Sequence, residues 1–330
     1  MPTIKDVAQK AGVSTATVSR VINDPTAVSP ETQKKVKQTI KQLNYQPNML
    51  GRNLRRCATR MIMILLQNIS NPFYSRVVRG IEKKALKNNY YTMICNNNSD
   101  PQQEKSYLQL LKSKLIDGVI LLEPEIDKKD LQEIGSSFPV VQCCEYLEGV
   151  DIPHISIDNT AAARTAVNHL LDCGHTKIAM ISGCGDLLSE KHREKGYREA
   201  LENAGIKFRP EYVKYGSYGF QGGKLKAREI LALPDRPSAI FAISDIMAIG
   251  AIGAITEAGL QVPDDVAVIG FDNTSISRMY RPPITTIEQP RFEMGSEAMT
   301  ALLTRIENKK KNIDNKILEH KLIIRESTVT

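Results

Sequence analysis

Three short segments at the start of the chain carry apolar residues at helical spacing. The first begins at Thr3, which has an acidic residue three positions later, and its apolar positions continue to Gly12. Ser14 is a good cap for a second helix, which Asn23-Asp24-Pro25 ends, and Ser29-Pro30 starts a third. Three short helices with a turn of about three residues after the first predict a helix-turn-helix domain over residues 1–45.

From residue 61 the pattern changes to short apolar runs separated by helical stretches. The predicted strands span residues 61–66, 91–95, 118–122, 140–143, 177–182, 239–244 and 266–272. Strands that alternate with helices form parallel sheets. The order of strand-helix units nearly repeats on either side of Ser156-Ile157-Asp158, and about 270 residues is large for one such sheet. We therefore expect two stacked α/β lobes.

The basic residues are concentrated at the start of the chain. The net charge is +7, and residues 1–60 hold eleven Lys and Arg against three Asp and Glu, whereas the other 270 residues hold 33 against 34. This split indicates a polyanion-binding module joined to a near-neutral body. A solvated basic tail is the alternative, but such a tail would lack the apolar core that these helices predict.

Other classes of protein are disfavoured by what the sequence lacks. No apolar run approaches the length of about eighteen residues that a membrane span needs, and the N-terminus has no apolar signal core, so we expect a cytoplasmic protein, nucleoid-associated when bound to DNA. The six cysteines show no C-x-x-C spacing and the five histidines no H-E-x-x-H motif. We expect no metal, no cofactor and no disulfide framework.

The second predicted helix presents small and basic side chains outward. A helix fits the major groove, where its first exposed side chains reach base edges. Arg20 can pair with guanine through two donors, and the small Thr15 and Ala16 allow close approach, with methyl groups that suit thymine. A solvated helix face is the alternative. The DNA contacts expected from this domain are Thr3, Ser14, Thr15, Ala16, Thr17, Ser19 and Arg20.

A long motif in this region, T-I-x-D-V-A-x-x-A-G-V-S-x-x-T-V-S-R-V-I-N followed by N-Y-x-P-N, resembles the LacI/GalR family of bacterial transcriptional repressors. The resemblance implies that a hinge segment, residues 46–58, folds into a helix on DNA and inserts a leucine into the minor groove. Leu54 matches that leucine, and Asn48 and Arg55 are further expected DNA contacts. The wedge costs a few kcal/mol of unstacking, offset by contacts that the kink permits. A buried linker leucine is the alternative for Leu54.

The resemblance extends over the whole chain and implies that residues 59–330 are similar to periplasmic sugar-binding proteins. Lobe 1 would comprise about 59–157 and 289–320, and lobe 2 about 158–288 and 321–330. Ligands of open α/β sheets bind beyond the carboxyl ends of the strands, and two lobes would bring these ends to one cleft. The residues expected to bind a small polar effector there, a sugar or a nucleoside, are Phe73, Tyr74, Glu145, Arg193, Tyr218, Ser244 and Asp272.

Each of these positions has a chemical role under the resemblance. The aromatic faces of Phe73 and Tyr74 suit a sugar ring or a base, with core packing as the alternative. Arg193 matches the family motif R-x-x-G, and its five donors suit ring oxygens and hydroxyls. Tyr218 matches a family aromatic position. Asp272 matches a carboxylate that accepts hydroxyl protons, although a carboxylate at a strand end also commonly caps a helix.

The sequence departs from the family pattern at two points in the expected cleft. The family often has Asn where Ser244 stands, which puts the donor at that position in doubt. It commonly has Asp-Arg where this chain has Cys144-Glu145. We therefore expect the ligand to be recognised differently at this wall, through Glu145.

Two other functions compete with a ligand-controlled repressor. An enzyme would have to use the Gly183-x-Gly185 turn, but this turn lacks the third glycine of a dinucleotide fingerprint, and neither G-x-x-x-x-G-K-[ST] nor G-x-S-x-G occurs. A DNA-binding dimer without a ligand response would need no polar strand ends. We expect a homodimer, or a tetramer, that binds double-stranded operator DNA and a small effector and does not associate with membranes.

Overall fold

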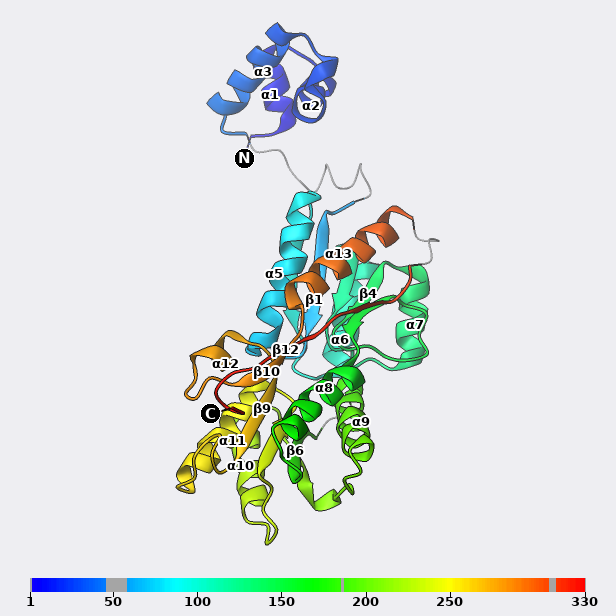
Figure 1. The fold of residues 1–330 in the computed structure, drawn as a ribbon. Helices are drawn as coiled ribbons and strands as arrows, with labels where there is room; N and C mark the ends of the chain where they lie inside the picture. Colours follow the sequence, from blue (N-terminus) through cyan, green and yellow to red (C-terminus); the bar gives the residue numbers. More distant parts are fainter. Residues whose placement is uncertain (1, 46–57, 185–186, 309–312, 330) are drawn as a thin grey trace. The chain divides into compact units, whose positions relative to one another are not determined.

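The computed structural model describes residues 2–45, 58–184, 187–308 and 313–329 (Figure 1). The chain divides into two compact units, Met1–Thr59 and Arg60–Thr330. Asn48, Leu54 and Arg55 lie outside the described residues, so the predictions for them stay predictions. Among the helices of the described ranges, none has the length and apolar character that crossing a membrane requires.

The first unit contains the three helices that the sequence predicts. They are α1 (Ile4–Ala11), α2 (Thr15–Asn23) and α3 (Pro30–Gln42), with a 3-10 turn, Pro25–Ala27, between the last two. Thr3 and Asp6 form a reciprocal capping box at the start of α1, and Gly12 ends this helix in the left-handed conformation, with φ at 61°. The side chain of Ser14 accepts the Thr17 N–H at the start of α2. These local signals fix the predicted helix boundaries.

The three helices enclose a small apolar core. Val7, Ala11, Val18, Val21 and Val36 are buried, and partly buried side chains such as Ile4 and Ile40 pack around them. Fully burying a valine side chain contributes about 1.5–3 kcal/mol. The basic N-terminal segment is therefore a folded domain and not a solvated tail.

The second unit contains two six-stranded sheets, each the centre of one lobe. The sheet of lobe 1 has the order β11-β5-β4-β3-β1-β2. Its strands are β1 (Met61–Leu66), β2 (Tyr91–Asn96), β3 (Gly118–Leu121), β4 (Val140–Cys143), β5 (His154–Ile157) and β11 (Lys316–Leu318). All of its pairings are parallel. The helices of this lobe are α5 (Pro72–Lys87), α6 (Pro101–Lys112), α7 (Lys128–Ser137) and α13 (Arg291–Glu307).

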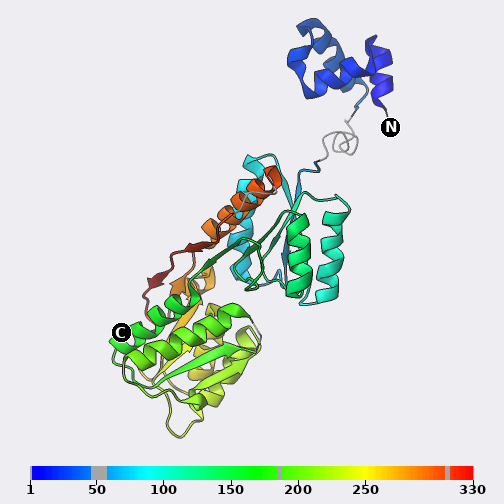
Figure 2. The same cartoon turned by 90° about the vertical axis from the view of Figure 1, so that its right-hand side faces the viewer.

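The sheet of lobe 2 has the order β12-β10-β9-β8-β6-β7. Its strands are β6 (Ile178–Gly183), β7 (Val213–Gly216), β8 (Ala239–Ala242), β9 (Ala267–Asp272), β10 (Thr285–Glu288) and β12 (Lys321–Ile323), and only β12 is antiparallel to its neighbour among these described strands. The helices are α8 (Asn159–Asp172), α9 (Leu188–Asn203), α10 (Phe220–Leu231), α11 (Asp245–Glu257) and α12 (Ser275–Met279), with a 3-10 turn, Pro210–Tyr212. Figure 2 shows α8 and α9 together on one side of this sheet.

The chain passes between the lobes at three places. After β5 it enters α8, which packs against α9 in lobe 2. After β10 it returns to α13, which packs against α5 in lobe 1, and from β11 it crosses again to β12. The predicted two-lobed α/β architecture with parallel sheets is confirmed. The predicted strands 118–122 and 266–272 differ from β3 and β9 by one residue, whereas 239–244 was longer than β8, which ends at Ala242 because Ser244 caps the next helix.

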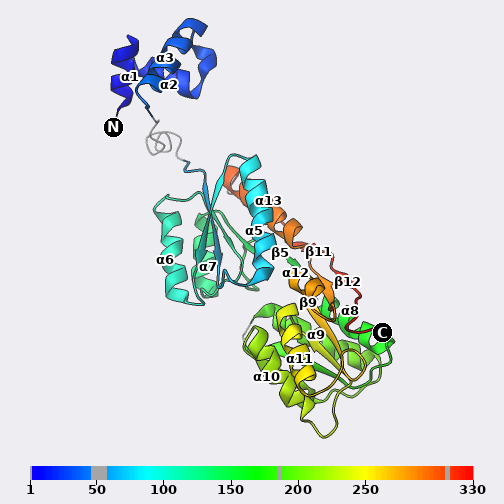
Figure 3. The same cartoon turned by 90° about the vertical axis from the view of Figure 1, so that its left-hand side faces the viewer.

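Two glycines allow α5 and α13 to pack closely in lobe 1 (Figure 3). A Cβ atom on Gly295 would lie 2.0 Å from the carbonyl oxygen of Val77, and one on Gly80 would lie 2.1 Å from the carbonyl oxygen of Phe292. These separations are far below van der Waals contact. The helix backbones therefore touch in a way that no other residue at these positions would permit.

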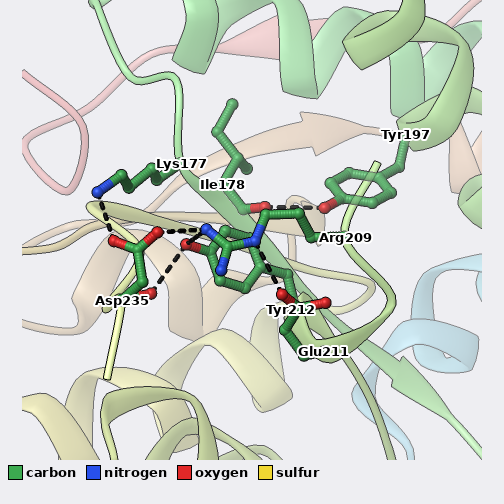
Figure 4. A network of polar contacts seen from close by, with 7 residues as sticks. All are labelled: Lys177, Ile178, Tyr197, Arg209, Glu211, Tyr212 and Asp235. Carbon is green, nitrogen blue, oxygen red and sulfur yellow. Dashed lines mark hydrogen bonds and ion pairs between the residues drawn. The ribbon is translucent and has the colours of Figure 1, made fainter. Parts of the chain in front are cut away.

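A polar network lies at the amino ends of three strands of lobe 2 (Figure 4). Asp235 pairs with Lys177 and Arg209, and the Tyr212 hydroxyl donates to the Asp235 carbonyl at 2.8 Å. The two cations lower the pKa of Asp235 to about 2. Lys177 precedes β6, Tyr212 precedes β7 and Asp235 precedes β8. Exposed ion pairs contribute little individually, so this network fixes the chain at the ends of the strands opposite the site described next.

Candidate functional site

A cavity of about 880 Å³ lies between the lobes, at the carboxyl ends of both sheets. Gln67, Glu123 and Cys144 reach it from the ends of β1, β3 and β4, whereas Ser217 and Asp272 reach it from the ends of β7 and β9. This is the edge where ligands of open α/β sheets bind, and the volume is typical of a site for a small molecule.

The structure brings six of the seven predicted effector-binding residues to this cavity: Phe73, Tyr74, Glu145, Arg193, Tyr218 and Asp272. Ser244 is different. It is buried and caps α11 by accepting the Met247 N–H. The Ser244 hydroxyl is therefore used within lobe 2, and this residue is not among those that line the cavity.

Asp272 ends β9 in an uncommon backbone conformation, with φ at 107°. Its carboxylate is only 4% exposed and accepts a hydrogen bond of 2.8 Å from Gln289. Burial raises the pKa of Asp272 to about 7, against the opposing effect of the Arg193 charge. A strained and desolvated carboxylate at a cavity wall is typical of functional sites.

Arg193 extends from α9 and is held on three sides. Its Nε donates to Asn159 Oδ1 at 2.9 Å and its Nη1 to the Ile243 carbonyl at 2.7 Å. The guanidinium carbon lies 3.8 Å from the centroid of the Phe271 ring. The guanidinium is therefore fixed in position before any ligand arrives, which lowers the ordering cost of binding.

The aromatic wall comes from the first turn of α5. Asn71 caps this helix by accepting the Phe73 N–H at 3.0 Å, and Phe73 and Tyr74 pack edge to face with their centroids 5.1 Å apart. Both rings are largely buried, at 7% and 4% exposure, and both line the cavity. The two alternatives from the sequence, core packing and cavity lining, therefore both describe these residues.

Glu123 and Gln289 are among the cavity residues that were not predicted from the sequence. Glu123 follows a predicted strand directly, so the reasoning that selected Asp272 would also have selected it. Burial raises the pKa of Glu123 to about 8. Gln289 follows β10, a strand that the sequence did not predict, so the reasoning from strand ends did not reach it. Among the residues that the structure describes, no three His, Cys, Asp or Glu side chains are grouped to hold a metal ion.

The predicted DNA contacts lie on the first two helices. Thr15, Ala16 and Arg20 are exposed along α2, and Ser19 is half-buried there. Ser14 and Thr17 hydrogen-bond to each other at 2.9 Å, so these two hydroxyls also serve the start of the helix.

At the start of α1, the Thr3 hydroxyl donates to the carboxylate of Asp6 at 2.9 Å. Thr3, like Ser14 and Thr17, is therefore both a predicted DNA contact and a residue that stabilises the start of a helix. Arg20 remains the long cationic side chain on the exposed face of α2.

A helix-turn-helix domain joined to a two-lobed domain with a ligand-sized cleft defines a DNA-binding transcriptional regulator of the ligand-responsive class. Residues 3–48 match the model of the bacterial regulatory proteins of the lacI family, and residues 167–328 match that of the periplasmic binding protein-like domain. The chain is 38% identical to the transcriptional repressor CytR of Escherichia coli (strain K12), over 99% of this chain and 96% of that protein. The chain belongs to the lacI family.

Solved structures agree with this assignment. The Lac repressor dimer bound to operator and the anti-inducer ONPF is 28% identical, with a TM-score of 0.91 over 100% of this chain and 99% of that one. The complex of the transcriptional regulator CelR with cellobiose is 33% identical, with a TM-score of 0.75 over 99% of this chain and 100% of that one. These relatives are transcriptional regulators and not enzymes. Three features of the sequence favour the same relative, the cytidine repressor: G-R-N-x-[KR]-R, the serine before Asp245, and F-D-N…P-P-I-T-T-I-x-Q-P-R-F-E-M-G.

Proposed function

We propose that this protein is a repressor whose affinity for operator DNA is set by a small polar effector, a sugar or a nucleoside, bound in the cavity between its lobes. The observation that carries the proposal is the convergence of Asp272, Arg193 and the aromatic pair Phe73 and Tyr74 on one cavity. The carboxylate accepts hydrogen bonds from hydroxyls, the guanidinium donates to oxygens, and the rings cover an apolar face.

The proposed DNA-binding form is a homodimer. One recognition helix reads only a few base pairs, so a two-fold symmetric dimer doubles the contacts on a pseudo-palindromic operator. The operator-bound Lac repressor dimer supports this proposal, and the cellobiose complex of CelR supports a ligand in the cleft. In this layout residues 1–45 read the operator, residues 46–58 form the hinge, with Leu54 in the minor groove, and residues 59–330 bind the effector.

The effector controls the repressor through the lobes. A ligand moves the equilibrium between two arrangements of the lobes only by its differential affinity for them. Residues from both lobes line the cavity, so a ligand that contacts both favours the closed arrangement. The operator affinity of the dimer then follows the state of the lobes.

The test is a thermal-shift panel of sugars and nucleosides on the full-length protein, followed by operator binding with each ligand that stabilises it. A ligand at one hundred times its dissociation constant adds about 2.7 kcal/mol to stability. A hit that changes operator affinity supports the proposal. A dimer that binds operator but responds to no ligand would indicate the alternative, a DNA-binding dimer without a ligand response. Sedimentation of the operator complex separates dimer from tetramer.

A further inference from the structure

The loop after β4 in lobe 1 contacts the first turns of α9 in lobe 2. Glu145 Oε2 accepts a hydrogen bond from the backbone N–H of Ser189 at 3.2 Å. Three residues further along each segment, Glu148 Oε1 lies 3.9 Å from Nε2 of His192. Both contacts join the two lobes at the rim of the cavity that Glu145, Glu148 and Ser189 line.

Glu145 gives the start of α9 a side-chain hydrogen-bond acceptor that the cap residue of this helix does not provide. The cap residue of α9 is Leu187, which makes no capping hydrogen bond through its side chain. The first N–H groups of a helix need acceptors, and the positive end of the helix dipole favours a negative charge. By contrast, α7 and α8 are capped by their own Asp127 and Asp158. The acceptor for α9 comes from the other lobe.

A strained turn delivers Glu145 to this position. Cys144 has a positive φ of 75°, in the region that residues with a Cβ atom rarely adopt. The Glu145 N–H is shared between the Cys143 carbonyl at 3.1 Å, which closes a three-residue turn of the strained type, and the Leu122 carbonyl at 3.2 Å. The Cys144 N–H bonds to the Ile155 carbonyl at 2.9 Å. The backbone at Cys144 and Glu145 is thus held to both neighbouring segments, and the turn at Cys144 places the Glu145 carboxylate against α9.

Two groups of α9 offset part of the cost of burying the Glu145 carboxylate. Burial raises the pKa of Glu145, and the Ser189 N–H and the positive charge of Arg193 oppose this rise. Ser189 and Arg193 both belong to α9. If the lobes separated, the carboxylate would lose both stabilising groups at once.

We propose that the pair formed by Glu145 and Ser189 is an interlobe latch that holds the lobes closed before any effector binds. Glu145 is a positioning residue in this device. Glu145 holds the start of α9 at the cavity wall through Ser189. It thereby also holds Arg193, which is four residues after Ser189 on the same helix. Its consequence for effector affinity rests on the proposed function: the apparent dissociation constant is the intrinsic one divided by the fraction of closed protein, so the latch improves affinity without a hydrogen bond of its own to the ligand.

The test measures the lobes without ligand. Non-canonical amino acids replace Lys129 in lobe 1 and Lys207 in lobe 2, two exposed positions, and carry spin labels. Pulsed electron paramagnetic resonance of the full-length protein then measures the distance between the lobes. We expect wild type to show mainly the short label-to-label distance of closed lobes. Glu145→Gln and Glu145→Ala should shift the distribution to longer distances. Ser189→Ala keeps the backbone N–H that donates to Glu145, so its distances should stay close to those of wild type.

Glu148→Gln is the matched control. It removes the same charge from the same loop, but the Glu148–His192 pair is long, and the Glu148 side chain is 60% exposed, so the distances should not change. Unchanged distances in both Glu145→Gln and Glu145→Ala, with circular dichroism like that of wild type, would overturn the latch and leave the ligand panel unaffected. An opened Glu145→Gln variant of a protein that responds to no ligand would keep the latch and refute the proposed function.

Discussion

Gln289 donates a hydrogen bond of 2.8 Å from its Nε2 to Oδ1 of Asp272. Gln289 follows β10 and Asp272 ends β9, and these strands are parallel neighbours in the sheet of lobe 2. Both side chains are buried and both line the cavity. The bond therefore fixes the plane of a carboxylate that a ligand in the cavity would meet.

We expect Asp272→Asn to lower effector affinity about ten- to a hundredfold. Asparagine keeps the size of the side chain, and its carbonyl oxygen still accepts from Gln289, but the negative charge that accepts ligand hydroxyls is lost. A buried ligand group left without its partner costs about 1–3 kcal/mol. Calorimetric titration with a ligand found in the panel measures the change. Operator binding without ligand should stay at the wild-type level, and an effector affinity equal to that of wild type would place the ligand elsewhere.

We expect Glu123→Gln to make the stability of the two-lobed domain less sensitive to alkaline pH. The carboxyl pKa is near 4.5 in an unfolded chain and about 8 in the folded protein, because burial disfavours the charge. The folded state binds this proton more tightly, so the contribution of Glu123 to stability is lost as pH rises from 4.5 through 8. Glutamine does not ionise.

At pH 8 the variant should be more stable by about 1–3 kcal/mol, the usual cost of an uncompensated buried polar group. Urea unfolding of the full-length protein at pH 5 and pH 8 measures this difference. Glu133→Gln, at an exposed position on α7, is the control and should change neither value. A stability difference between Glu123→Gln and wild type that does not grow with pH would contradict the role assigned to burial.

Gly295→Ala should destabilise lobe 1 by separating two helices. The added Cβ atom would lie 2.0 Å from the Val77 carbonyl oxygen, so α13 must move away from α5. Overpacking of this kind costs about 1–3 kcal/mol. Gly253→Ala is the matched control, because this helical glycine has its nearest neighbour at 3.5 Å, an ordinary contact. Alanine there should be neutral or stabilising by about 0.5–1 kcal/mol. Thermal unfolding measures the melting temperatures of both variants. Equal shifts from the wild-type value would refute the close packing of α5 and α13.

The N-terminal domain was predictable almost to the residue because its boundaries are set by local chemistry. Thr3 and Ser14 cap helices through bonds to N–H groups three residues away, and Gly12 ends a helix through its own backbone. In the body, the apolar runs Met61–Leu66 and Val140–Cys143 form strands with the predicted bounds. Such runs are buried on both faces, and hence their composition identifies them.

The strands that the sequence missed depend on distant partners. Thr285–Glu288 begins with two threonines that would be exposed in isolation, but Thr285 Oγ1 lies 2.7 Å from Thr328 Oγ1, 43 residues further along the chain. The site shows the same division. The predicted strand ends located the cavity, whereas Gln289 follows a strand that was not predicted. The contact of Glu145 with α9 depends on how the two lobes pack, which the sequence pattern does not reveal.

Arg20 is exposed on α2, the helix that we predict enters the major groove. A bidentate contact to guanine discriminates one base pair, because only guanine presents two acceptors to the guanidinium there. Arg20→Ala should therefore weaken operator binding by about 1–3 kcal/mol and relax the preference at one base pair in each half-site. Lys37→Ala, which removes a charge from the exposed side of α3, should weaken binding to all sequences alike if it has any effect, because a phosphate contact carries no base information. Binding selection on a randomised operator, at one fixed salt concentration, distinguishes the two patterns. A uniform loss for Arg20→Ala, with the base preferences of wild type retained, would make Arg20 a phosphate contact and would assign base reading to the small residues Thr15 and Ala16.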